Sequence, residues 1–193
     1  LARTLLLIAA PAATGLALVA QPLSDVMIGE DMRAQAASIM PWIALSGLIN
    51  GFVLHYVSEA YQLSHRTDLR AWLMLIPALA NLALNAILLP WIGLMGAVYS
   101  TVACYALALL LLAGVARKLA PLSWPWRDFL KVAGACSAMA IAVRMAPSTG
   151  GMTELPMKAS VGATIYVMTA LVLDAAGARA ALQQFTSRRA RRV

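Results

Sequence analysis

Charged residues are scarce in this chain. Asp, Glu, Lys and Arg together make up only 12% of its 193 residues, whereas a soluble domain typically carries about 25%. Hydrophobic residues reach 62% and the mean hydropathy is +0.78. This composition argues against an ordinary soluble domain and predicts a protein whose solvent is lipid.

The motifs of several chemistries are also missing. The two cysteines, Cys104 and Cys136, both lie inside apolar runs, which argues against a disulfide framework and predicts buried free thiols. The sequence has no Gly-rich phosphate loop, no nucleophile elbow and no cluster of His, Cys and acids at metal-ligand spacing. We therefore expect neither an enzyme nor a bound metal or cofactor.

Long apolar runs fill most of the chain. In lipid such runs form helices of about 20 residues, because every backbone N–H and C=O must be bonded within the segment. We expect an all-α, polytopic membrane helix bundle of about six transmembrane helices over residues 1–175, followed by a basic cytoplasmic tail over 176–193. The expected spans are 4–23, 36–57, 71–90, 94–116, 129–146 and 158–173.

The distribution of basic residues predicts an orientation. If the spans alternate, 12 of the 15 Lys and Arg residues fall on the side of the N-terminus and only three on the other. The richer side is then cytoplasmic and holds both termini. The net charge of +7 is explained by contact with anionic lipids, with no need for nucleic acid. The cytoplasmic set is Arg3, Arg66, Arg70, Arg117, Lys118, Arg127, Lys131, Arg179, Arg188, Arg189, Arg191 and Arg192, and the outer set is Arg33, Arg144 and Lys158.

Polar residues at membrane depth are costly and often functional. The second expected span carries Asn50, His55 and Glu59. His55 and Glu59 are four residues apart, so on an α-helix they share a face and reach each other. Two interpretations stand: a proton-coupled pair facing a water-filled cavity, or a Glu59 that only marks the cytoplasmic end of the helix.

Two further polar positions carry open alternatives. Asn81 and Asn85 share one face of the third expected span, where they either line a substrate path or bond to a neighbouring helix. Arg144, near the outer end of the fifth expected span, either extends to the interface or contacts the phosphate of a lipid substrate.

One stretch of the sequence resembles a known family. Residues 61–118 begin Tyr-Gln-Leu-Ser-His-Arg-Thr-Asp-Leu-Arg, contain Asn81-x-x-x-Asn85 and continue Leu88-Leu89-Pro90-x-x-Gly93-x-x-Gly96-Ala97. An upstream piece reads Gly29-Glu30-Asp31-Met32-Arg33-Ala34. Together they resemble the C-terminal half of bacterial polysaccharide and O-antigen flippases, which belong to the multidrug/oligosaccharidyl-lipid/polysaccharide (MOP) exporter superfamily.

The resemblance implies a transporter of the bacterial inner membrane that moves lipid-linked oligosaccharide for polysaccharide and lipopolysaccharide synthesis. Family members place two bundles around a central cavity, so this chain is expected to be a fragment that needs a missing N-terminal bundle or a second copy. Depth and polarity, and not a family motif, make Asn50, His55, Glu59, Asn81 and Asn85 cavity candidates. The alternatives are a multidrug or cation exporter or a lipid II flippase of the same superfamily, and a non-transporting membrane scaffold of a polysaccharide synthase.

Overall fold

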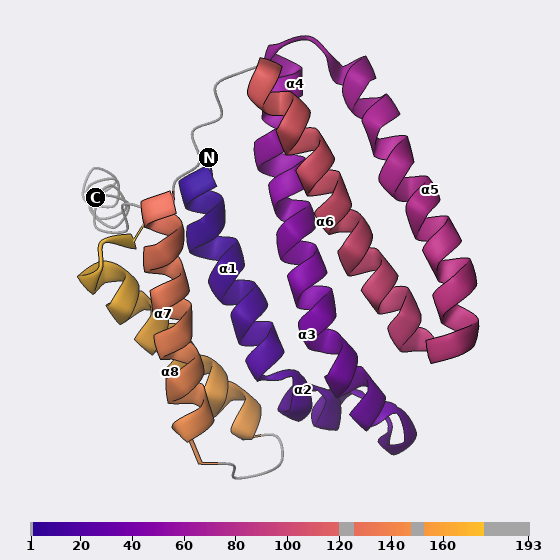
Figure 1. The fold of residues 1–193 in the computed structure, drawn as a ribbon. Coiled ribbons are helices and arrows are strands. Elements are labelled where there is room, and N and C mark those ends of the chain that lie inside the picture. Colours follow the sequence, from indigo (N-terminus) through magenta and orange to yellow (C-terminus); the bar gives the residue numbers. More distant parts are fainter. Residues whose placement is uncertain (1, 120–125, 148–152, 176–193) are drawn as a thin grey trace, which may run out of the picture.

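The computed structural model describes residues 2–119, 126–147 and 153–175, and all regular structure within them is helical (Figure 1). The expected all-α class is thereby confirmed for this part of the chain. The expected basic tail, 176–193, lies outside the described residues. The elements are α1 (Ala2–Leu18), α2 (Ala20–Met27), α3 (Glu30–Phe52), the π-helical η1 (Val53–Val57), α4 (Ser58–Leu63), α5 (Thr67–Ile92), α6 (Leu94–Leu119), α7 (Trp126–Met145) and α8 (Glu154–Val172).

The long helices form an open row in the order α5, α6, α3, α1, α7 and α8 (Figure 1). Each helix packs mainly on its neighbours in this order, and α3, η1 and α4 follow one another as one long rod. Large apolar side chains remain exposed along the row. On α5, for example, Trp72, Leu82 and Trp91 are 71%, 69% and 86% exposed. An apolar surface of this extent is consistent with a membrane-embedded protein.

Among the described residues, four helices are long and apolar enough to cross a membrane: Glu30–Leu63, α5, α6 and α8. The number rises to five if α1 and α2, which meet at a 65° bend, form one broken span. Helix α7 is not among them, because Arg127, Asp128, Lys131 and Arg144 interrupt its apolar character. The expected count of six therefore stays a prediction.

Within the expected span 4–23 the helix is bent, between α1 and α2 after Leu18. Proline has no backbone N–H, so Pro22 leaves the carbonyl of Leu18 without its helical donor. The flanking bonds survive, with the N–H of Val19 donating to Gly15 O (3.0 Å) and that of Leu23 donating to Val19 O (2.9 Å). The missing bond therefore coincides with the bend.

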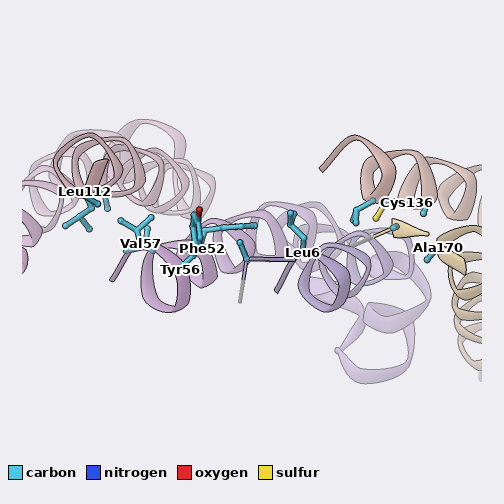
Figure 2. Close-up of a cluster of buried hydrophobic side chains, with 14 of the residues drawn as sticks. Leu6, Phe52, Tyr56, Val57, Leu112, Cys136 and Ala170 are labelled. Atoms are coloured by element: carbon cyan, nitrogen blue, oxygen red, sulfur yellow. The ribbon is translucent and has the colours of Figure 1, made fainter. Parts of the chain in front are cut away.

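The buried core lies between neighbouring helices along the row. Its largest members include Leu6, Phe52, Tyr56, Val57 and Leu112, several of which are labelled in Figure 2 together with Cys136 and Ala170. On α6 the buried positions recur every four residues and are mostly small, which lets neighbouring helices approach closely. This stripe consists of Gly96, Ser100, Cys104, Ala108, Leu112 and Ala116.

Helix ends gather at two levels of the molecule (Figure 1). The starts of α1 and α7 lie together, joined by an ion pair from Arg3 Nε to Asp128 Oδ2 (2.8 Å). Lys131 Nζ donates to the Asp174 carbonyl oxygen (3.3 Å), which brings the end of α8 to the same level. The ends of α4 and α6 and the start of α5 also lie there. Most described basic residues thus sit at this end, and Arg33, Arg144 and Lys158 sit toward the other.

Candidate functional site

A chain of hydrogen bonds links the polar residues of α5 and α6. Asn85 Nδ2 donates to Asn81 Oδ1 (3.0 Å), and the Ser100 hydroxyl donates to Asn85 Oδ1. Thr101, one residue further along α6, donates its hydroxyl to the Ala97 carbonyl oxygen (2.8 Å). The amide nitrogen of Asn81, at the end of the chain, has no acceptor among the described residues. The structure therefore brings Asn81 and Asn85 together, as expected from their spacing, and adds Ser100.

The turn between α5 and α6 fixes this register. Gly93 has a φ of 66°, a left-handed conformation that side chains disfavour, and its N–H donates to Leu89 O (2.9 Å). A Cβ at Gly96 would lie only 2.4 Å from the Leu88 carbonyl oxygen, so the two helices touch backbone to backbone there. In such a hairpin, residues equally far from the turn lie at one level, and Asn85 therefore meets Ser100.

A cavity of about 210 Å³ opens beside Asn81, at the end of this chain of hydrogen bonds. Asn81, Thr101, Tyr105 and Cys104 contribute to its wall, and Pro77 lies one turn of α5 away from Asn81. Proline at 77 leaves the carbonyl of Leu73 without a helical donor, which adds an acceptor near this wall. The cavity is smaller than the roughly 300–1,000 Å³ of a pocket for a drug-sized ligand. It has room for part of a ligand only.

The groups in this cavity are neutral. Amide, hydroxyl and carbonyl groups exchange hydrogen bonds with the hydroxyls and amides of a ligand without the large desolvation cost of a buried charge. Sugars present this kind of surface. These groups suit the binding of a polar, uncharged ligand through hydrogen bonds.

The other cavity candidates lie apart from this cluster, on the rod formed by α3, η1 and α4. Helix α6 lies between that rod and α5 (Figure 1). Asn50 is half-buried, and its side chain makes no hydrogen bond within the described part of the chain. His55 and Glu59 are both exposed.

No hydrogen bond or ion pair joins His55 and Glu59 in the described structure, although their spacing would let them reach each other on an α-helix. The π-helical segment Val53–Val57 is the reason. A π-helix has more residues per turn than an α-helix, so residues four apart no longer lie one above the other. Arg144 is exposed in the last turn of α7, in agreement with either of its two interpretations.

Two interactions were missed at the level of sequence. Lys158 Nζ and Glu154 Oε1 form an ion pair (2.5 Å) whose side chains are only 14% and 11% exposed. Their spacing of four residues on an apolar helix was the available signal. The Tyr166 hydroxyl donates to the Leu7 carbonyl oxygen (2.8 Å), a contact across most of the chain that no local pattern indicates. Neither interaction belongs to the α5–α6 cluster.

Comparison of the chain with known proteins found no match. No protein-family model, curated protein or solved structure matches it. The resemblance to MOP-type flippases therefore rests on the quoted residues alone.

Proposed function

We propose that this chain is one helix bundle of a membrane transporter that carries lipid-linked oligosaccharide across the bacterial inner membrane. The observation that carries the proposal is the hydrogen-bonded chain Ser100–Asn85–Asn81, which ends in an open amide beside a cavity between two apolar helices. A sugar head group needs such neutral donors and acceptors when it leaves water.

In this proposal the chain crosses the membrane about six times and keeps both termini in the cytoplasm. The charged residues of α7 are compatible with its inclusion as a span, because they lie only in its first two turns and its last turn. The segment between them, Val132–Val143, carries no charge. The concentration of basic residues at one end of the molecule supports the orientation.

An open row supplies only one wall of a transport pathway. A second bundle, from a longer chain or from a second copy, is needed to enclose a head group. Asn50 supports this requirement, because an amide at membrane depth without a hydrogen-bond partner in its own chain gains from a polar neighbour or from cavity water.

The function is tested with Asn81→Leu plus Asn85→Leu in the intact transporter, expressed in cells that depend on it for surface polysaccharide. We expect about a tenfold or greater loss of polysaccharide, since the substrate loses hydrogen bonds at the cavity. The matched control is Ala83→Leu plus Ala86→Leu, at two exposed positions of the same helix. Unchanged polysaccharide at equal protein levels with the Asn variant would refute the assignment of the cavity.

Topology is tested independently of transport. Thr67 and Thr153 are both exposed and lie at opposite ends of the molecule. In a background of Cys104→Ala and Cys136→Ala, we expect an impermeant maleimide to label Thr153→Cys in whole cells. Thr67→Cys should react only after permeabilisation. The reverse pattern would overturn the orientation.

A further inference from the structure

Arg70 differs from the other basic residues that are partly buried. Within the described ranges, the basic residues that are not exposed are Arg33, Arg70, Lys131 and Lys158. Carboxylates or backbone carbonyl oxygens accept hydrogen bonds from the other three. Arg70 has no hydrogen bond or ion pair with any other residue of the described structure. It is therefore a partly buried cation whose counter-charge is still to be found.

The surroundings of Arg70 make this situation costly. Its Nε atom is buried and has no hydrogen-bond partner among the described residues. A cation that leaves water without a counter-charge is destabilising, because the lost hydration is not replaced. The acids nearest to it in sequence, Glu59 and Asp68, are both exposed and form no ion pair with it. We therefore expect the counter-charge to come from another molecule.

The turn between α4 and α5 fixes the position of Arg70. His65 has a φ of 53°, in the left-handed region, and the N–H of Arg66 donates to Tyr61 O (2.9 Å), so α4 is closed at its end. The Tyr61 hydroxyl donates to the Leu112 carbonyl oxygen (2.8 Å), which ties α4 to α6. Arg70, in the first turn of α5, is thus held where α4, α5 and α6 meet (Figure 1).

The charge and polarity of this junction indicate which anion fits. Leu63, which ends α4, and Trp72, two residues after Arg70, are 72% and 71% exposed, so apolar surface flanks the site. A cation at a helix end beside exposed apolar surface suits the phosphate of a lipid, whose acyl chains lie along the helices. A guanidinium binds a phosphate with two parallel hydrogen bonds. Exposed residues at the same end add positive charge, namely Arg66, Arg117 and Lys118.

We propose that the phosphate of an anionic phospholipid in the cytoplasmic leaflet binds Arg70 at the junction of α4, α5 and α6 and is its counter-charge. The inference rests on the membrane location and orientation in the proposed function, but not on the transported substrate. It assigns a specific lipid contact to one residue, whereas the exposed basic residues at this end attract such lipids only through their summed charge.

The test uses the full chain in neutral detergent and native mass spectrometry with equal concentrations of phosphatidylglycerol and phosphatidylcholine. We expect the wild type to retain phosphatidylglycerol about tenfold more, as one charge-assisted contact provides. Arg70→Met keeps an apolar stem but removes the charge, and should abolish most of this preference. Arg117→Met removes the same charge at an exposed position of the same end and should change the preference by less than about twofold. Equal loss in the two variants would overturn the specific site.

Two further arms identify the source of the anion. Inorganic phosphate at the same concentration should not displace the retained phosphatidylglycerol, and displacement would assign the site to a soluble anion. Arg70→Lys preserves the charge without the planar fork, so it should keep only part of the preference. Full preference in Arg70→Lys, or none in the wild type, would overturn the guanidinium contact with a lipid.

Stability gives an independent readout. In lipid-free detergent, Arg70→Met should be at least as stable to heat as the wild type, because it removes an uncompensated charge. Added phosphatidylglycerol should then stabilise the wild type and not the variant, and equal stabilisation of both would contradict the proposal. Correct maleimide labelling of Thr153→Cys and Thr67→Cys in cells would show that such a failure concerns this site and not the membrane location.

Discussion

The two arms of the row are held together by different means. Helices α5 and α6 are joined by a turn at Gly93, and their polar contacts connect residues at matching distances from it. Helix α1 comes from the opposite end of the chain from α7 and α8, and the three pack through buried apolar side chains such as Leu6 and Met139 as well as through the bond of Tyr166 to Leu7. The first arm therefore depends on local geometry, whereas the second also depends on contacts between residues far apart in the sequence.

The largest effect is expected in the second arm, at the Lys158–Glu154 pair. Removal of one partner of a buried ion pair typically destabilises by about 3–5 kcal/mol. Lys158→Met should lower the free energy of unfolding by an amount of this order, measured by denaturation in detergent. The double change with Glu154→Leu should restore most of it. If the double variant is as unstable as Lys158→Met alone, the attraction between the two charges makes a net contribution to stability.

The next largest effect is expected in the first arm, at Gly96. A side chain there meets the Leu88 backbone, which cannot turn away, so Gly96→Ala should force α5 and α6 apart and destabilise by about 1–3 kcal/mol. Gly114→Ala is the matched control on the same helix, because nothing lies within 4 Å of its added Cβ. Equal thermal stability of the two variants would contradict the close approach.

A smaller effect is expected from the bond between α8 and α1. Tyr166→Phe removes the donor to the Leu7 carbonyl and should lower the free energy of unfolding by about 1 kcal/mol. Pro11→Ala restores a backbone N–H for that carbonyl, so Tyr166→Phe should cost less in the Pro11→Ala background. A double-mutant cycle measures this coupling. Strictly additive effects would show that Pro11 and Tyr166 do not interact through the Leu7 carbonyl.

The smallest effect is expected at Arg3 and Asp128. Their ion pair is short, at 2.8 Å, but the Arg3 side chain is 68% exposed. Exposed pairs contribute about 0–1 kcal/mol and are screened by salt. Arg3→Gln should therefore change stability by less than about 1 kcal/mol, and any difference from the wild type should vanish at high ionic strength. A large loss of stability that salt does not change would show that the ion pair between Arg3 and Asp128 is important in holding α1 to α7.

The sequence predicted the first arm better than the second. Hydropathy located α5 and α6 to within a few residues, and the spacing of Asn81 and Asn85 predicted a shared face. Ser100 was predictable too, because it mirrors Asn85 across the Gly93 turn. Local periodicity is sufficient for such a hairpin, since its partners are neighbours in sequence.

The features that were not predicted depend on irregularities of the helical backbone or on residues far apart in the sequence. Pro11 and Pro22 both remove a helical hydrogen bond, yet α1 continues past Pro11 and ends before Pro22. At the first site the Tyr166 hydroxyl, from a helix far away in the sequence, replaces the missing donor. The π-helical segment Val53–Val57, which contains His55, likewise could not be predicted from the four-residue spacing of His55 and Glu59.

The Gly93 turn has a consequence for biosynthesis. No charged residue lies between Arg70 and Arg117, and only a single residue separates α5 from α6. In the proposed topology this hairpin enters the bilayer as one unit, and it is flanked on the cytoplasmic side by Arg66 and Arg70 before it and by Arg117 and Lys118 after it. Because Asn85 and Ser100 both belong to the hairpin, we expect their hydrogen bond to form without any helix that follows α6.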